Sequence, residues 1–218
     1  MALEALIFDF DGLILDTEWP VYRSIAAEFE RHGLTYALES WVHVVGTSHD
    51  VDWAGELEHR LARAVNREEA ERRRRTRFAE LMAAAAVLPG VLDLLDAADA
   101  AGIAVGVASS SPRSWVAGHL ADHGLAGRFD AVITLDDVGV AKPAPDLYLA
   151  ALAALAVPAA GAVALEDSAH GCTAAKAAGI RVVAAPNAVT AGLDFAHADL
   201  LVPSLAALSL AELAALTG

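Results

Sequence analysis

Short apolar runs alternate with helical segments over the last two thirds of the 218-residue chain, and this alternation constrains the fold more than any other feature. Runs such as 103–108 and 162–165 have the length of strands and carry no charge, which is typical of strands buried on both faces. The helical segment 91–101 ends at Gly102, a common helix stop. Strands that alternate with helices predict a parallel sheet covered on both faces. We therefore expect a three-layer, Rossmann-like α/β fold.

The same reasoning assigns the individual elements of this sheet. The predicted strands are 5–8, 103–108, 131–134, 162–165, 181–185 and 199–202. The predicted helices are 91–101, 112–123, 145–156, 168–178 and one at the end of the chain.

A segment of different character interrupts this pattern after the first strand. It holds most of the arginines, and its amphipathic patterns, such as 56–82, indicate helices. We expect an inserted helical cap domain at 17–85, and an α/β core domain formed by 1–16 together with 86–218.

Charge and composition exclude several classes of function. The chain has 15 Lys and Arg against 29 Asp and Glu, for a net charge of −14, which disfavours binding to nucleic acid. The arginine run 72–77 lies among glutamates, as on a solvated helix face. The uncharged stretch 147–165 contains Pro158 and Gly161, which favour a helix, a turn and a strand over a membrane span. No signal peptide is visible, so we expect a cytoplasmic protein with no membrane partner.

Polar side chains follow four of the predicted strands at the point where each strand ends. Because the carboxyl ends of parallel strands meet at one edge of a sheet, we expect these side chains to converge on one crevice. They are Asp9 and Asp11 after the first strand, Ser109 and Ser110 after the second, Lys142 in the loop after the third, and Glu166 with Asp167 after the fourth.

The residue types in this crevice suit phosphate chemistry. Asp9 and Asp11 are two residues apart, so both carboxylates face the same side of an extended segment. Two such carboxylates can divide the work of nucleophile and acid/base, or share a hard cation such as Mg²⁺. Lys142, one of two lysines in the chain, can neutralise a phosphoryl oxygen, and Ser109 can donate a hydrogen bond to another.

Each motif also has an ordinary explanation when taken alone. The Asp-x-Asp-Gly sequence at Asp9 is common in turns, and serines such as Ser109 often cap helices. Glu166 and Asp167 can complement a helix dipole, and Lys142 with its proline can form a solvated turn. All four motifs at consecutive strand ends, in one order, favour the catalytic interpretation.

The chain resembles the haloacid dehalogenase superfamily of phosphohydrolases. The motifs that carry the resemblance are Asp9-Phe-Asp-Gly-Leu-Ile-Leu-Asp-Thr17, Val107-Ala-Ser109, Lys142-Pro-Ala-Pro-Asp146 and Glu166-Asp-Ser168. The helical insert stands where the β-phosphoglucomutase-like branch of this superfamily has its small cap. The resemblance covers essentially the whole chain.

This resemblance implies roles for the motif residues. Asp9 would attack phosphorus and form an aspartyl-phosphate, and Asp11 would protonate the leaving oxygen and then activate water. Ser109 and Lys142 would bind the phosphoryl oxygens. The ligands of Mg²⁺ would be Asp9, the backbone carbonyl of Asp11, and Asp167, with Glu166 nearby or acting through water.

Two departures from the mutase pattern bear on the reaction. The sugar phosphomutases of this branch have a histidine four residues after the motif threonine, where this chain has Val21. Their cap loop reads Gly-x-Ser-Arg, where this chain has Gly46-Thr-Ser-His49. We expect Gly46, Ser48, His49 and Ser110 to contact the substrate.

The expected activity is therefore that of a Mg²⁺-dependent phosphatase, acting on a small phosphorylated metabolite such as a sugar phosphate. The alternatives are a sugar phosphomutase of the β-phosphoglucomutase type and a catalytically silent protein that binds a phosphorylated ligand. The presence of Asp9, Asp11, Lys142 and Asp167 speaks against the silent alternative.

Overall fold

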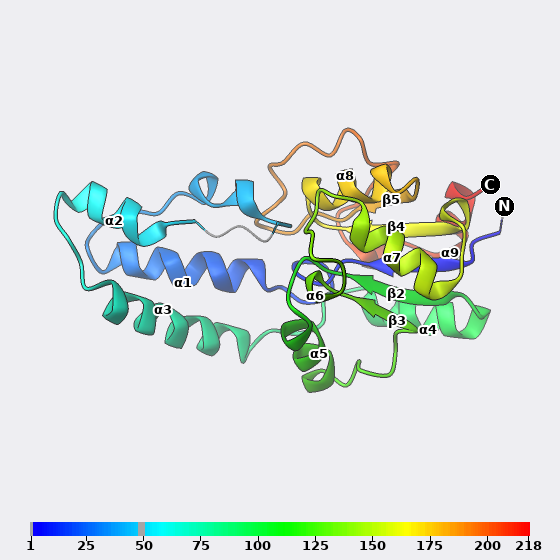
Figure 1. The fold of residues 1–218 in the computed structure, drawn as a ribbon, viewed down its shortest axis with the longest axis horizontal. Coiled ribbons are helices and arrows are strands. Elements are labelled where there is room, and N and C mark those ends of the chain that lie inside the picture. The colour runs from blue at the N-terminus through cyan, green and yellow to red at the C-terminus, as the bar shows by residue number, and fades with distance from the viewer. Residues whose placement is uncertain (1, 48–50) are drawn as a thin grey trace.

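A parallel sheet forms the centre of one part of the protein, on the right in Figure 1. The structure is a computed structural model that describes residues 2–47 and 51–218. Six strands lie in the order β3-β2-β1-β4-β5-β6. Their bounds are β1 Ala5–Phe8, β2 Ala104–Ala108, β3 Ala131–Ile133, β4 Ala162–Glu166, β5 Arg181–Ala184 and β6 Leu200–Leu201. Every pairing is parallel, which confirms the predicted α/β sheet.

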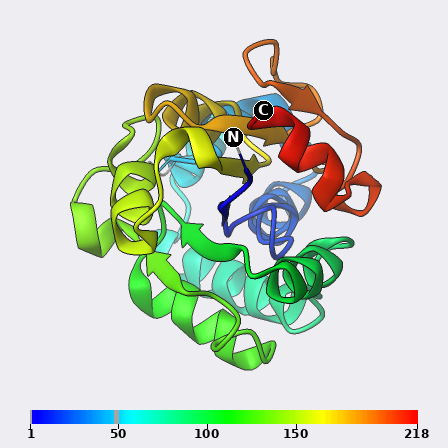
Figure 2. The same cartoon turned by 90° about the vertical axis from the view of Figure 1, so that its right-hand side faces the viewer.

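Alternate residues of the central strand face opposite layers of helices. Leu6 and Phe8 pack in one apolar cluster with the helices α4, α5 and α9, while Ala5 and Ile7 pack in a second cluster with α7 and α8. Figure 2 shows these helices on both sides of the strands, which gives three layers. The helices are α4 Val91–Ala101, α5 Arg113–Asp122, α7 Asp146–Leu155, α8 Ala169–Ala177 and α9 Leu210–Leu216.

Three further helices lie beyond the carboxyl ends of the strands (Figure 1). They are α1 Glu18–Glu30, α2 Trp53–Leu61 and α3 Arg67–Met82, and two short 3₁₀ helices, Leu38–Ser40 and Val42–Val44, lie between α1 and α2. Phe29, Trp41 and Leu57 are buried in a third apolar cluster, which also includes Val189 from the segment after β5. The two chain segments that connect these helices to the sheet pair with each other. Leu15 forms a β-bridge with Val87, and the backbone N–H of Leu88 donates to the carbonyl of Ile14 at 2.9 Å.

The prediction of a continuous helical pattern over 56–82 is wrong in one respect, because the structure has two helices there, α2 and α3. Ala62, at the end of α2, has a left-handed φ of 51°, and Asn66 caps α3 by accepting the N–H of Glu69 at 3.1 Å. The amide of Asn66 competes with the backbone for hydrogen bonds, which favours a helix start over a helix interior. A short helix, α6 Leu135–Val138, was not expected, and a Thr134–Asp137 capping box holds it.

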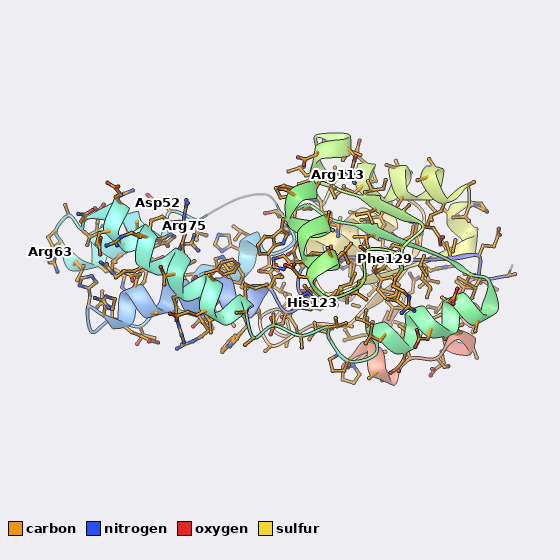
Figure 3. All side chains as sticks on the ribbon, turned by 90° about the horizontal axis from the view of Figure 1, so that it is seen from below. Asp52, Arg63, Arg75, Arg113, His123 and Phe129 are labelled. Atoms are coloured by element: carbon orange, nitrogen blue, oxygen red, sulfur yellow. The ribbon has the colours of Figure 1, made fainter. Side chains whose placement is uncertain are left out.

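Two stretches of unusual composition have ordinary structures. Each arginine of the run 72–77 pairs with a glutamate, and the side chain of Arg75, labelled in Figure 3, is 75% exposed. The uncharged stretch 147–165 forms most of α7, a turn and β4. In the described part of the chain no helix has both the length and the apolar character needed to cross a membrane.

Candidate active site

A buried ion-pair network lies at the carboxyl ends of β1 and β4. Lys142, in the loop between α6 and α7, places Nζ 2.7 Å from Asp9 Oδ1 and 2.6 Å from Glu166 Oε1, and its side chain is 1% exposed. Tyr148, on α7, donates its hydroxyl to the same Glu166 oxygen at 2.5 Å. The register of the sheet explains the proximity, since Phe8 lies opposite Leu165 and their successors are Asp9 and Glu166. The register thus places Asp9 and Glu166 side by side, and the loop after α6 brings Lys142 to both of them.

This network holds more negative charge than Lys142 neutralises. Burial and the charge of Glu166 raise the pKa of Asp9 well above its usual range, against the opposing effect of Lys142. Burial and the charges of Asp9 and Glu166 likewise raise the pKa of Asp167. Burial alone would lower the pKa of Lys142, but Asp9 and Glu166 raise it. The lysine is therefore a fixed cation among carboxylates that need further positive charge.

Three of these carboxylates form a group that can hold a metal ion. Asp9, Glu166 and Asp167 each offer an oxygen, and these oxygens lie within 4.8 Å of one another. Asp167 Oδ1 is buried and has no hydrogen-bond partner among the described residues. Glu166 is engaged on both oxygens, because Ser168 donates to Oε2 at 3.3 Å while Lys142 donates to Oε1. Oxygen ligands of this kind, one of them unpaired, fit a hard divalent cation.

Asn187 fixes the second oxygen of Asp167. Its Nδ2 donates to Asp167 Oδ2 at 2.7 Å and to the carbonyl of Gly12 at 3.0 Å, while backbone N–H groups donate to its Oδ1. Gly12 has a φ of 77°, and a Cβ there would lie 2.3 Å from Asp167 Oδ2. Only glycine therefore allows this approach. Gly12 and Asn187 thus hold the segments after β1 and β4 close together.

Asp11 points away from the three-carboxylate group. Its Oδ2 accepts the hydroxyl of Ser111 at 2.6 Å and that of Ser109 at 3.4 Å, and its Oδ1 accepts the indole N–H of Trp115 at 2.8 Å. Burial raises the pKa of Asp11, and the hydrogen bonds from Ser111 and Trp115 oppose that effect. The two aspartates of the first motif thus have different partners, one a lysine and the other neutral donors.

The remaining candidate residues lie where the two halves of the molecule meet. Ser110 donates its hydroxyl to the carbonyl of Gly46 at 3.1 Å, so these two residues bind each other. Gly46 also lies close to Ser168, since a Cβ at Gly46 would be 2.4 Å from Ser168 Oγ. Ser48 and His49 fall outside the described residues.

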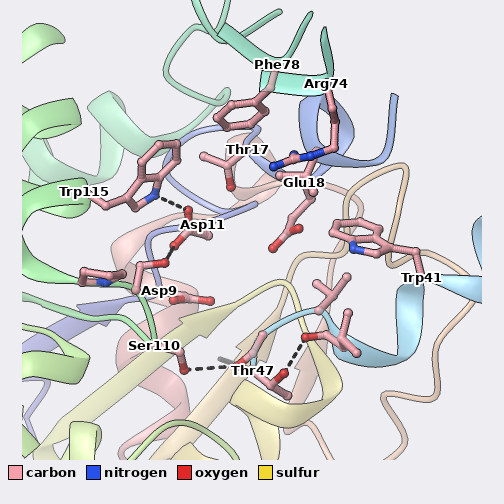
Figure 4. Close-up of a pocket in the computed structure, with 16 residues that line it drawn as sticks. Asp9, Asp11, Thr17, Glu18, Trp41, Thr47, Arg74, Phe78, Ser110 and Trp115 are labelled. Carbon is pink, nitrogen blue, oxygen red and sulfur yellow. Dashed lines mark hydrogen bonds between the residues drawn. The ribbon is translucent and has the colours of Figure 1, made fainter. Parts of the chain in front are cut away.

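A pocket of about 410 Å³ opens above Asp9 and Asp11 (Figure 4). One wall belongs to the sheet side and includes Ser111 and Trp115, while the other comes from the helical side. The helical wall contributes both apolar and charged groups, including Glu18, Trp41, Arg74 and Phe78.

The two charged residues of the helical wall differ in their partners. The guanidinium of Arg74 contacts both oxygens of Glu71 at 2.8 Å. Glu18 is 9% exposed, and burial together with the charges of Asp11 and Asp9 raises the pKa of its carboxyl well above the usual range. The pocket therefore offers an ion-paired cation and a poorly solvated acid near the two aspartates.

The family model of the haloacid dehalogenase-like hydrolases matches residues 6–185. The chain belongs to this family. A Bacillus subtilis protein named as a phosphatase, YhcW, is 44% identical over 211 residues, covering 97% of this chain and 96% of that protein. Hexitol phosphatase B of Escherichia coli is 31% identical, covering 96% of each chain. The crystal structure of a CbbY variant from Rhodobacter sphaeroides in complex with xylulose-(1,5)bisphosphate superposes with a TM-score of 0.72 at 33% identity, covering 96% of this chain and 97% of that one.

Membership of the haloacid dehalogenase-like hydrolases confirms the predicted family. Several residues of the site were nevertheless not predicted. Asn187 follows β5, so the strand-end rule could have found it had it been applied to that strand. Glu18 directly follows the first motif. Tyr148 and Arg74 lie inside helical patterns that look ordinary, and no sequence signal separates them from their neighbours.

Proposed function

We propose that this protein is a Mg²⁺-dependent phosphatase that hydrolyses a small phosphorylated metabolite through an aspartyl-phosphate. The observation that carries the proposal is the position of Asp9, a buried carboxylate paired with Lys142 at the base of a pocket. Asp11 lines the same pocket with different partners. The similarity to proteins named as phosphatases over nearly the full chain supports the same reaction class.

In the first step, a carboxylate oxygen of Asp9 attacks phosphorus. The new bond joins Asp9 to phosphorus, the bond from phosphorus to the ester oxygen breaks, and that oxygen takes a proton from Asp11. Lys142 lies beside Asp9 and can neutralise charge on a phosphoryl oxygen, while the hydroxyl of Ser109, which donates to Asp11 at 3.4 Å, can donate instead to another phosphoryl oxygen. The burial of Lys142 strengthens its effect, because water does not screen it.

In the second step, Asp11 takes a proton from a water molecule. The oxygen of that water attacks phosphorus, and the bond to Asp9 breaks to release inorganic phosphate and restore the carboxylate. Asp11 thus acts first as an acid and then as a base, which suits a carboxyl group whose burial raises its pKa.

Asp9, Asp167 and the backbone carbonyl of Asp11 would hold the metal, and Glu166, which contacts Lys142, would lie beside them. The unpartnered Oδ1 of Asp167 and the excess of carboxylates fit this assignment. When bound, Mg²⁺ supplies positive charge that offsets the repulsion among the carboxylates and the charge of the phosphoryl group. Asn187 keeps Asp167 in place for this role.

The helical part of the chain, residues 17–85, acts as a cap that selects the leaving group. Its wall of the pocket combines aromatic rings with Glu18 and Arg74, which can bind hydroxyl and anionic groups. A sugar phosphate or polyol phosphate has groups of this kind. The complex of CbbY with xylulose-(1,5)bisphosphate and the similarity to hexitol phosphatase B support this substrate class.

The direct test is a screen of phosphorylated metabolites for release of inorganic phosphate, with and without Mg²⁺. We expect p-nitrophenyl phosphate to be hydrolysed slowly and one or more sugar or polyol phosphates to be hydrolysed faster. Phosphate release only in the presence of a divalent cation is the expected result. A protein that binds phosphorylated ligands but releases no phosphate from any of them would contradict the proposal.

A second experiment separates a phosphatase from a phosphomutase. Val21 lines the pocket and cannot transfer a proton, so nothing at this position delays the attack of water on the aspartyl-phosphate. With β-glucose 1-phosphate, Mg²⁺ and a trace of glucose 1,6-bisphosphate, we expect any product to be free glucose and phosphate. Formation of glucose 6-phosphate faster than free phosphate would favour the mutase.

A further inference from the structure

The indole of Trp115 connects Asp11 to the helical part of the molecule. Trp115 lies in the first turn of α5, two residues after Arg113 begins the helix, and its side chain points into the pocket (Figure 4). Its Nε1–H donates to Asp11 Oδ1 at 2.8 Å. Its ring stacks on Phe78 of α3, with centroids 5.8 Å apart and planes at 25°. One side chain therefore touches both the acid/base carboxyl and the opposite wall of the pocket.

The hydrogen bond makes the two oxygens of Asp11 unequal. An indole N–H can only donate, so the oxygen that faces it, Oδ1, must act as an acceptor. The other oxygen, Oδ2, faces the hydroxyls of Ser111 and Ser109, which can donate or accept. The indole bond therefore favours Oδ2 as the oxygen that exchanges a proton with the leaving group, because Oδ1 is engaged as an acceptor. Oδ2 also lies on the side of Ser109, the proposed phosphoryl-binding hydroxyl.

Ring contacts and packing against the apolar core orient the indole. Besides Phe78, the ring meets His119 edge-on, with centroids 4.1 Å apart, and His119 stacks on Phe10, the residue between the two aspartates. Trp115 and Phe78 also line a second cavity of about 450 Å³ in addition to the substrate pocket. These rings, the bond to Asp11 and packing against the apolar core of the sheet side hold the indole in place between the two cavities.

We infer that Trp115 is a positioning residue for Asp11, and that its contact with Phe78 makes the orientation of this acid/base group depend on the position of α3. This inference rests on the proposed function, since it concerns proton transfer in that reaction. By binding Oδ1, the indole N–H fixes the rotation of the carboxyl group and with it the direction of Oδ2, and the stacked pair Trp115–Phe78 joins that geometry to the helix that lines the leaving-group pocket.

The test uses substrates whose leaving groups need a proton to different degrees. p-Nitrophenolate departs as a stable anion, phenolate is more basic, and the alkoxide of p-nitrobenzyl alcohol needs protonation. For each phosphate, kcat/KM covers the steps up to departure of the leaving group, so it reports the acid role of Asp11. Trp115→Phe retains an aromatic ring and removes the N–H. We expect the ratio of kcat/KM for p-nitrobenzyl phosphate to that for p-nitrophenyl phosphate to fall about tenfold or more.

The ratio distinguishes positioning from a general structural role. Both constants scale with the amount of folded enzyme, so partial unfolding of the Trp115→Phe protein lowers both and leaves the ratio unchanged. Phe78→Ala, which does not touch Asp11, should lower the same ratio by about threefold. The double variant should match Trp115→Phe, because the two residues act through one hydrogen bond.

Two failures can be told apart in this design. If wild-type protein releases no phosphate from the three probes or from any metabolite, the proposed function fails. If wild-type protein is active and Asp11→Asn abolishes hydrolysis of p-nitrobenzyl phosphate, yet Trp115→Phe leaves the ratio at its wild-type value, the proposed function stands and the inference is overturned. A Phe78→Ala ratio equal to that of the wild type would overturn the link to α3.

Discussion

The two walls of the pocket differ in how firmly their charged groups are held. On the sheet side, Asp9 lines the pocket, and its side chain and those of Lys142 and Glu166, which belong to the same network, are at most 5% exposed. Each of the three makes at least two short polar contacts. On the helical side, Glu18 is buried at 9% exposure, whereas the side chain of Arg74 is 19% exposed and pairs with a glutamate on its own helix. The sheet-side charges thus form one buried network, and the cation of the helical side is held by a neighbour on the same helix.

This difference indicates a division of labour. Chemistry at phosphorus requires groups that do not move, and strand ends in the middle of a sheet provide them. In the proposed function, recognition of the leaving group tolerates more variation and falls to the helices that pack beyond the sheet. Substitutions on the sheet side should therefore change turnover by orders of magnitude, whereas substitutions on the helical side should mainly change KM.

The largest effect is expected at Asp9. Asp9→Asn keeps the shape of the side chain and removes the attacking charge, so kcat should fall by about four orders of magnitude or more. Thermal unfolding should change little, because Glu166 still pairs with Lys142. Asp96→Asn is the matched control, since its carboxylate is 71% exposed and pairs with Arg128 far from the pocket. An Asp9→Asn enzyme that retains a tenth of wild-type activity would exclude the aspartyl-phosphate.

Removal of the metal should abolish turnover while leaving the sheet folded. EDTA should stop phosphate release and added Mg²⁺ should restore it. Asp167→Asn should raise the Mg²⁺ concentration for half-maximal activity by about tenfold or more, and Asn187→Ala, which removes a residue that positions Asp167, should raise it less.

Binding of Mn²⁺, followed by electron paramagnetic resonance, measures the same change without turnover. The affinity for Mn²⁺ should be highest in the wild type, lower in Asn187→Ala and lowest in Asp167→Asn. Full activity of the chelated wild-type protein would show that this acidic group serves another purpose.

The two walls also differ in how far the sequence could predict them. Asp9 and Glu166 lie at the ends of β1 and β4, and the rule that parallel strands end at one edge is enough to bring these two together. Lys142 comes after α6, a helix that the sequence did not predict, so the rule alone does not place it. The rule does not say which neighbours complete the hydrogen bonds. The sequence therefore did not indicate a role for Tyr148 in the site, because a tyrosine in an apolar helix usually packs in the core.

The helical wall was harder to predict for a physical reason. Which face of a helix meets the pocket depends on the packing of α1 against α3 and on the connections to the sheet. In the run 72–77 every arginine has a glutamate within reach, so the pattern of charges is the same for Arg74, which lines the pocket, as for Arg75, which does not. Three-dimensional packing alone separates the two.

This pair of arginines allows the smallest expected effect to be measured with a matched control. Both guanidinium groups pair with Glu71 Oε1, so either substitution leaves that carboxylate one cationic partner. Arg74→Gln removes a charge from the pocket and should raise KM about tenfold for a metabolite with hydroxyl or anionic groups in its leaving part, with little change in kcat. Arg75→Gln should leave both constants unchanged. Equal effects of the two substitutions would show that α3 does not select the leaving group, and a fall in kcat for Arg74→Gln without a change in KM would place Arg74 with the catalytic residues of the sheet side.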